Sequence, residues 1–414
     1  MLAIAEAQER VLACAGALPP VREALGRCLG LVLAEDAASD LDLPPYDKAM
    51  VDGYAVRSDD LREGRGELAV VEEVHAGQVP TLALGPGQAT RIMTGAPVAR
   101  GADAVVMVEH TRVLAEAGDG SARCDTWLGR VEVACPKPVR AGINIMARGL
   151  EMRRGQVVLS AGAEIRAQEV GLLAAVGRSE VNVHRRPRVA VVATGDELVE
   201  ADRQPGPGQI RNSNGPTLVA LAARAGGEPL YLGIARDNVE SLRELVGRGL
   251  READVLVLSG GVSAGLKDLV PTVLREFGVA EVFHQVALKP GKPIWFGKGG
   301  STLVFGLPGN PVSALVCFEL FVRPAIRRLM GQRNALAAPL TARLAEDKAY
   351  CTDRPTYHPA VVTWDGSDGY RVRTVEWLGS PDLRATTEAN ALVLLPAGDH
   401  QHRAGDRVEV LMLS

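Results

Sequence analysis

The chain has 414 residues, of which 47% are hydrophobic and 4% aromatic, and it carries a formal net charge of −4. This length is too great for one ordinary core, so we expect several domains whose interiors are filled mainly by Leu, Val and Ala. The weak negative charge excludes the basic surface of a protein that binds nucleic acid or an anionic membrane.

The apolar runs and the cysteines predict a soluble, cytoplasmic protein. The sequence has no apolar run of membrane-spanning length and does not open with a signal segment. Its six cysteines form no C-x-x-C pair and lack the spacing of a disulfide framework, so we expect reduced thiols.

The N-terminal part of the chain predicts helices on either side of a β-rich insertion. Residues 44–137 contain short apolar runs between glycines, and Asp52-Gly53 is typical of a tight turn. A helix near residues 168–176 is expected to pack on the N-terminal helices at 3–15 and 20–33. The second of these is predicted from four apolar residues at helical spacing, namely Val21, Leu25, Cys28 and Leu29.

From Arg188 onward, buried strands alternate with helices. Strands are expected near 189–193, 229–234 and 255–258, and helices at 214–225 and after Asp237. This alternation predicts a parallel, doubly wound sheet, whose ligands bind beyond the carboxyl ends of the strands.

Short alternating runs follow at 391–395 and 407–412 and predict a final small β domain. We therefore expect four domains. They are an arm formed by 1–43 and 138–180, an inserted β-rich domain at 44–137, an α/β domain at 181–331 and a C-terminal β domain at 332–414.

The most informative stretch is Ser259-Gly260-Gly261-Val262-Ser263, which connects a buried strand to a helix. This geometry leaves backbone N–H groups uncovered at a helix N-terminus, where an anion can bind. Asp268 lies in the same loop, and Lys289 and Lys292 follow the next strand. Backbone donors, a carboxylate and two lysines together predict a polyphosphate held with a divalent cation.

Most of these residues also have a structural explanation. Asp52-Gly53 fits a hairpin turn, Asp237 fits a helix N-cap, and Glu197 fits a charge in a first helical turn. Thr94-Gly95 fits a strand-ending turn, and the two lysines fit exposed surface charges. The basic cluster at 185–188 is expected to be a solvated linker.

Several familiar motifs are missing. The sequence has no Walker loop, no G-x-G-x-x-G dinucleotide motif, no zinc-binding Cys/His spacing and no G-x-S-x-G elbow. His400 and His402 are separated by one residue, and we expect an exposed pair on a β-strand there rather than a metal site.

Six motifs, taken in chain order, together resemble the MoeA-type molybdopterin molybdenumtransferases, the family that includes the E domain of gephyrin. They are L-P-P-Y at 43–46 with D-G-Y-A at 52–55, T-G-A-P at 94–97, T-G-D-E-L at 194–198, S-G-G-V-S at 259–263, K-P-G-K-P at 289–293 and G-L-P-G-N-P-V-S at 306–313. The resemblance covers residues 1–331.

This resemblance implies that adenylylated molybdopterin and molybdate react, with Mg²⁺, to give the molybdenum cofactor and AMP. It also implies a MogA-like α/β domain, an elongated N-terminal arm and a homodimer with a shared active site. Catalytic positions would be Asp52, Thr94 and Asp268, and metal ligands would be Glu197, Asp237 and Asp268. Substrate would be bound by Glu197, Ser259, Gly260, Gly261, Val262, Ser263, Lys289, Lys292, Pro308, Asn310 and Pro311.

The sequence departs from the family pattern at three places. Leu266 stands where an acidic residue is usual, Met146-Ala147 where two arginines are common, and Asn212 where an aspartate is common. Two other functions therefore stay open. They are a non-catalytic molybdopterin-binding or scaffold protein, and the related molybdopterin adenylyltransferase, which is also a candidate partner. The adenylyltransferase needs no counterpart of residues 44–137, so Asp52 and Thr94 favour the molybdenum-inserting enzyme.

Overall fold

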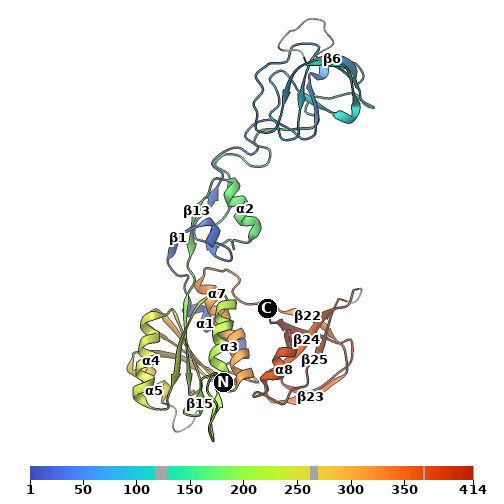
Figure 1. Ribbon diagram of the computed structural model, residues 1–414. Helices are drawn as coiled ribbons and strands as arrows, with labels where there is room; N and C mark the ends of the chain where they lie inside the picture. The colour runs from blue at the N-terminus through green and yellow to red at the C-terminus, as the bar shows by residue number, and fades with distance from the viewer. Residues whose placement is uncertain (117–127, 262–268, 367–368, 414) are drawn as a thin grey trace. The chain divides into compact units, whose positions relative to one another are not determined.

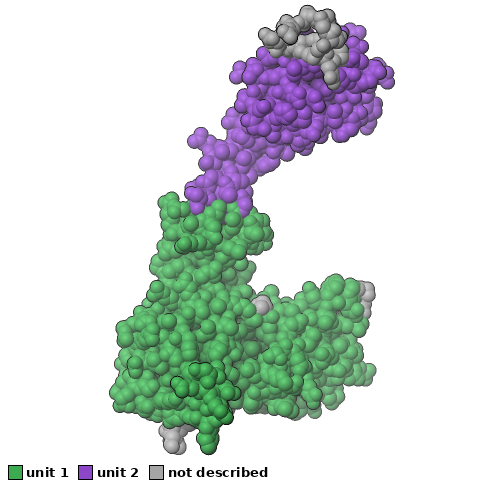
Figure 2. Space-filling model, in the orientation of Figure 1, with its two compact units in different colours: residues 1–35, 161–170, 180–414 green, residues 36–160, 171–179 purple. Residues whose placement is uncertain are grey.

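The computed structural model describes residues 1–116, 128–261, 269–366 and 369–413. Contacts divide the chain into two compact units, which we describe separately (Figure 2). The larger unit contains residues 1–35, 161–170 and 180–414, and the smaller unit contains 36–160 and 171–179.

The smaller unit is built on a six-stranded sheet, as expected for a β-rich insertion. Its core includes Tyr54, Val56, Leu68 and Val131, all nearly inaccessible to solvent. In sheet order the strands are β8 (Ala104–Met107), β5 (Gly53–Val56), β7 (Gln88–Ile92), β6 (Arg65–Val74), β10 (Gly129–Ala134) and β9 (Thr111–Glu116).

The hairpin turn predicted at Asp52-Gly53 is wrong. Strand β4 (Lys48–Ala49) pairs with β11 (Ile145–Met146), whereas β5 pairs with β7 and β8. Glycine is required at 53 for another reason, because a Cβ atom there would collide with the Val106 carbonyl of β8.

At the N-terminus the first predicted helix is confirmed and the second is wrong. Helix α1 spans Ile4–Cys14, but the next segment forms strand β1 (Pro20–Ala24), a short 3-10 turn and strand β2 (Val32–Leu33). Every residue of β1 pairs with β13 (Glu180–His184), a partner some 160 residues away that local spacing does not reveal. Val21 and Leu29, expected on a buried helical face, are exposed. Helix α2 (Ala167–Ala175) agrees with the prediction.

The α/β part of the larger unit contains a six-stranded sheet that is mainly, but not entirely, parallel. Four neighbouring strands are parallel, whereas β20 is antiparallel to both of its neighbours. The expectation of a parallel sheet is therefore wrong at this edge. The order is β17 (Glu228–Ala235), β14 (Arg188–Thr194), β18 (Val255–Ser259), β21 (Thr302–Leu307), β20 (Trp295–Gly299) and β19 (Ala280–His284).

Helices cover both faces of this sheet, as a doubly wound fold requires (Figure 1). Helices α4 (Val239–Glu252) and α5 (Val270–Glu276) pack together on one face, against buried strand residues such as Val192 and Leu258. The other face is covered by α3 (Asn214–Arg224), α6 (Pro311–Cys317), the π-helical turn η4 (Phe318–Val322) and α7 (Arg323–Leu329).

The strand order places a topological switch point between β14 and β18. From β14 the chain crosses to β17 on one side and then returns to β18 on the other. Loops that leave the carboxyl ends of these two strands therefore diverge and leave a crevice, which is where ligands bind in such sheets.

The basic cluster at 185–188 is not a solvated linker. Arg185 donates from Nη1 and Nη2 to the two carboxylate oxygens of Asp254, both at 2.7 Å, and Arg186 donates to the carbonyl oxygens of Gly226 and Leu29. Burial favours the neutral form of Asp254, but the hydrogen bonds from Arg185 and from the Arg188 N–H outweigh it and lower the pKa of that carboxyl. The cluster thus fastens β14 to the start of β18.

The last domain is a closed β-barrel, as expected for a small β domain. Its strands are β22 (Leu340–Leu344), β25 (Tyr370–Thr374), β24 (Thr356–Trp364), β26 (Ala391–Leu395) and β28 (Arg407–Met412).

Outside the barrel, β23 (Lys348–Thr352) pairs with β27 (Gly398–His402) and helix α8 spans Leu383–Glu388. His400 and His402 pack on Tyr350, with ring centroids 5.3 and 5.6 Å from the tyrosine ring. Within the described ranges no helix is long and apolar enough to cross a membrane.

Candidate active site

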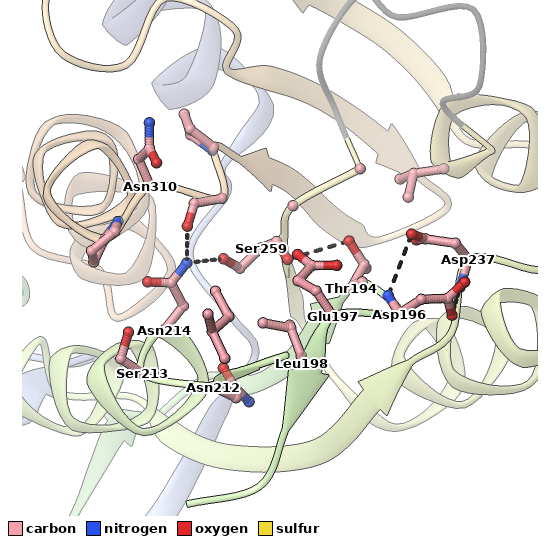
Figure 3. A pocket seen from close by; sticks show the side chains of 18 of the residues that line it. Thr194, Asp196, Glu197, Leu198, Asn212, Ser213, Asn214, Asp237, Ser259 and Asn310 are labelled. Atoms are coloured by element: carbon pink, nitrogen blue, oxygen red, sulfur yellow. Dashed lines mark hydrogen bonds between the residues drawn. The ribbon is translucent and has the colours of Figure 1, made fainter. Parts of the chain in front are cut away.

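A cavity of about 1250 Å³ opens at the carboxyl ends of β14, β17, β18 and β21, at the switch point of the sheet (Figure 3). Asp237 lies at one side of it, Asn214 at the other, and Glu197 between them. Small-molecule pockets usually measure roughly 300 to 1,000 Å³, so this one has room for a large substrate. Eight predicted site residues line it, namely Glu197, Asp237, Ser259, Gly260, Gly261, Pro308, Asn310 and Pro311.

The two glycines after β18 are required by their backbone conformation and by crowding. Gly260 has φ +96° and Gly261 has φ +64°. A Cβ atom on Gly260 would lie 2.7 Å from the carbonyl oxygen of Thr194 and 2.8 Å from its Oγ1. The ends of β14 and β18 therefore approach as closely as their backbones allow.

The sequence predicts a free backbone N–H at Gly260 that could bind an anion, and this expectation is wrong. This N–H donates to the Leu307 carbonyl oxygen at 3.0 Å, which extends the contact between β18 and β21 by one residue. Val262, Ser263 and Asp268, the other predicted contributors from this loop, lie outside the described residues, as does Leu266.

Asn214 connects three segments of the pocket wall, a role that the sequence did not indicate. From the start of α3 its Nδ2 donates to Ser259 Oγ and to the Gly309 carbonyl oxygen, both at 2.7 Å. These two bonds use both amide hydrogens, so the side chain has no donor left and only its acceptor oxygen, Oδ1, remains available. Asn214 thus holds the end of β18 and the loop after β21 together.

Glu197 belongs to the loop that leaves β14. Its carboxylate lies directly over Gly195, where any Cβ atom would collide with it. The side chain is exposed toward the pocket and makes no ion pair with any residue that the structure describes. A carboxylate in this state is available to a hard cation such as Mg²⁺.

Asp237 does not cap helix α4, and that expectation is wrong. The N-cap is Asn238, whose side chain accepts a hydrogen bond from the Ser241 N–H. Asp237 instead makes a reciprocal pair with Asp196, in which each backbone N–H donates to the other's carboxylate, at 3.1 and 3.4 Å. The longer of these bonds is weak, and the Asp237 carboxylate keeps further capacity to accept.

Asn212 is buried at the pocket wall and begins a hydrogen-bond chain that runs outward to the surface. Its Oδ1 accepts from the Gly215 N–H at the start of α3, and its Nδ2 donates to the Tyr231 hydroxyl, which donates to Glu200. Burial and the neighbouring Glu200 raise the pKa of Tyr231 well above its usual value. The amide suits this chain because a carboxylate could not donate to the tyrosine.

The loop after β21 is organised as the sequence predicts, with one addition. Asn310 occupies the N-cap position of α6 and Pro311 its first turn. The Asn310 side chain makes no capping bond, however, and its Nδ2 donates to Ser380 Oγ at 2.9 Å. Pro381 also lines the cavity, so the last domain contributes to the wall. No local pattern signals this contact, which joins residues 70 positions apart.

The two predicted lysines are not among the residues that line the cavity. Lys289 and Lys292 are both exposed. The Lys289 backbone pairs with the barrel, donating to the Pro355 carbonyl oxygen and accepting from the Tyr357 N–H. Of this loop, Pro293 reaches the pocket wall.

Asp52 and Thr94 form a pair within the smaller unit. The N–H and the Oγ1 of Thr94 both donate to Asp52 Oδ1, each at 2.7 Å. These two hydrogen bonds, the backbone bond first, lower the pKa of Asp52. The second carboxylate oxygen, Oδ2, takes no part in these two bonds and can accept a proton or a metal ion.

No group of three or more His, Cys, Asp or Glu side chains within the described ranges is placed to hold a metal ion. The donor set that the sequence suggests includes Asp268, which lies outside those ranges. The other two members of that set, Glu197 and Asp237, both line the cavity.

Three family models match successive parts of the chain. They are the MoeA N-terminal region (domain I and II) over residues 2–177, a probable molybdopterin binding domain over 190–328 and the MoeA C-terminal region (domain IV) over 341–413.

Full-length relatives agree with these matches. A molybdopterin molybdenumtransferase of Staphylococcus epidermidis is 34% identical, over 99% of this chain and 95% of its own length. Molybdopterin molybdenumtransferase 1 of Mycobacterium tuberculosis is 36% identical, over 100% and 99%. The crystal structure of the molybdopterin biosynthesis MoeA protein of Pyrococcus horikoshii matches with a TM-score of 0.81 at 29% identity, covering 100% of both chains. The chain therefore belongs to the MoeA family of molybdopterin molybdenumtransferases, which are transferases of molybdenum cofactor biosynthesis.

Proposed function

We propose that this protein inserts molybdate into adenylylated molybdopterin and releases AMP, with the substrate's phosphoanhydride held in the cavity between β14 and β18. The observation that carries the proposal is this large cavity at the switch point, lined by carboxylates and by a close-packed Gly-Gly turn. Similarity to transferases along the full chain supports the same reaction.

Within the cavity the residues would divide the work by their chemistry. Glu197 and Asp237, with Asp268, would hold Mg²⁺, because hard cations prefer carboxylate oxygens. The ion would neutralise charge on the phosphate oxygens while the anhydride is cleaved. Asn214 and Ser259 would keep the walls at a fixed separation, and Lys289 and Lys292 would approach the phosphates from the neighbouring loop. Positioning and charge neutralisation suffice, so no covalent nucleophile is needed.

The inserted domain would complete the site in a homodimer. Asp52 and Thr94 would be supplied by the second copy of the chain, with the ionised Asp52 carboxylate facing the substrate. The low pKa of Asp52 supports a role in which this group stays charged at neutral pH. We further propose the four-domain division given above, a location in the cytoplasm and delivery of substrate by a molybdopterin adenylyltransferase.

Two alternatives differ in what they require of the chain. An adenylyltransferase would need ATP and would not need the inserted or C-terminal regions, yet relatives match the chain over its whole length. A non-catalytic scaffold would bind the nucleotide without turnover, and the departures at Leu266, Met146 and Asn212 keep it open. Met146 lies in β11, opposite Lys48 of β4.

One experiment distinguishes the three functions. The protein is mixed with adenylylated molybdopterin, Mg²⁺ and molybdate, and AMP is followed by chromatography. AMP release that depends on molybdate supports the transferase. ATP-dependent adenylylation of molybdopterin would identify the adenylyltransferase, and binding without AMP release would identify a scaffold.

A further inference from the structure

Arg236 lies at the carboxyl end of β17, directly before Asp237. Its side chain reaches across to the loop that leaves β14, where Nη1 approaches three carbonyl oxygens. The distances are 3.0 Å to Leu198, 3.2 Å to Asp196 and 3.5 Å to Gly195. One nitrogen carries two hydrogens, so these bonds are shared, and the bond to Gly195 is the weakest.

Every carbonyl oxygen from Gly195 to Val199 has a donor. Arg236 supplies three of them, the Ile210 N–H donates to Glu197 at 2.8 Å, and the Asn212 N–H donates to Val199 at 2.8 Å. The pairing of strands β15 (Leu198–Val199) and β16 (Ile210–Arg211) therefore holds the Glu197 and Val199 carbonyls from one side of the loop. Arg236 holds the Leu198 carbonyl between these two and the Gly195 and Asp196 carbonyls before them, so the backbone on both sides of Glu197 is fixed.

The base of Arg236 is fixed as well. Its backbone N–H donates to Ser241 Oγ in the first turn of α4, and the next residue, Asp237, makes the reciprocal pair with Asp196. The loops that carry Glu197 and Asp237 are therefore joined twice, by a guanidinium and by two backbone N–H groups.

Arg236 does not belong to the cavity wall. Its Nη1 hydrogens are directed to backbone carbonyls, so this nitrogen has no capacity left for substrate. Because Arg236 is not among the residues that line the cavity, we expect its effect on the reaction to pass through the residues that it holds.

We propose that Arg236 is the positioning residue that fixes the Glu197 and Asp237 carboxylates at one separation, so that together they bind a divalent cation. This inference rests on the proposed function for its catalytic consequence, but its structural content can be tested without turnover. Arginine suits the task because its planar fork spreads donors over several carbonyls, whereas a lysine ammonium is a single point.

The test compares Arg236→Gln and Arg236→Lys with Arg243→Gln. Arg243 is a matched control, because it lies in α4 nearby but pairs with Glu276 on the surface. Hydrogen exchange of peptides covering 194–212 reports the Ile210 and Asn212 amides, whose acceptors lie in the held loop. Mg²⁺ titration of AMP release and calorimetric binding of Mg²⁺ with AMP report the carboxylate pair, and thermal unfolding reports the fold.

We expect Arg236→Gln to speed exchange of these two amides and to raise the Mg²⁺ concentration for half-maximal AMP release by about 10- to 100-fold, the usual cost of losing an outer-sphere partner. Arg236→Lys should fall between this variant and the wild type. In a Glu197→Gln background, Arg236→Gln should add little, because the residue it positions is already disabled.

Exchange and Mg²⁺ dependence like those of Arg243→Gln would overturn the inference, and so would a loss that merely follows a lower melting temperature. If the wild type releases no AMP, the proposed function fails. The exchange and calorimetric results then still decide whether Arg236 holds the loop.

Discussion

Replacing Gly260 by alanine tests the close approach of β14 and β18 that forms the floor of the cavity. Gly260 has φ +96°, and an added Cβ would lie 2.7 Å from the Thr194 carbonyl oxygen and 2.8 Å from Thr194 Oγ1. Thr194 ends a strand with partners on both sides, so its backbone cannot retreat without disturbing the sheet. The substitution must therefore move the turn.

The expected cost has two parts. A left-handed backbone costs an alanine about 1 to 2 kcal/mol, and overpacking in a tight interior costs about 1 to 3 kcal/mol more. We therefore expect Gly260→Ala to destabilise the α/β domain by about 2 to 5 kcal/mol in total. Gly278→Ala separates the two parts, because Gly278 has φ +71° with nothing within 4 Å of an added Cβ, and it should cost only about 1 to 2 kcal/mol.

Hydrogen exchange across a urea series, read at peptides of β14 and β18, measures the local free energy of opening for both variants. The AMP-release assay should show at least a roughly tenfold loss for Gly260→Ala, because small displacements of positioning groups are costly, and little change for Gly278→Ala. Equal stability and equal activity of the two variants would refute the crowding argument.

Three further substitutions test other parts of the account. Asn214→Asp places a carboxylate oxygen against the Gly309 carbonyl, so it should lower the free energy of opening by about 1 to 3 kcal/mol in the same exchange assay. It should also weaken AMP binding in calorimetry, and unchanged binding would contradict the role of Asn214. Thr94→Val removes one of the two bonds that lower the pKa of Asp52, so the acid limb of the pH–rate profile should move to higher pH, whereas Thr94→Ser should leave it in place. Because the folded-state pKa of Asp254 is lowered, its pairing with Arg185 stabilises the protein above the unfolded pKa of about 3.9 and is lost as pH falls through the lower folded value. Asp254→Asn should therefore flatten the acid side of the melting-temperature profile, and an unchanged slope would show that the pair does not contribute.

Sequence patterns predicted the elements that are defined by local spacing. Buried strands such as β14 and β18, the amphipathic helix α4 and the alternating runs of the barrel carry their periodicity within a few residues. The helix predicted at 20–33 is wrong because strand β1 depends on pairing with β13, which lies far away in sequence. An apolar spacing of three and four residues was outweighed there by tertiary pairing.

The candidate site was predictable where chemistry and position coincide at the end of a strand. Glu197 and Asp237 follow β14 and β17, and both line the cavity. Asn214 and Arg236 also lie at strand or helix ends, and the rule that ligands bind at carboxyl ends could have drawn attention to Arg236. Their importance comes from hydrogen bonds to carbonyl groups, which no residue pattern encodes. The hydrogen bond from Asn310 to Ser380 joins residues 70 positions apart, and no local pattern predicts it.

Whether the cavity between β14 and β18 holds the phosphate of the nucleotide is best tested by a crystal structure of the protein with AMP and Mg²⁺. We predict that the phosphate lies in this cavity, beside the turn after Ser259, with the cation in contact with Glu197 or Asp237. A structure in which AMP occupies another surface while this cavity contains only water would contradict the account.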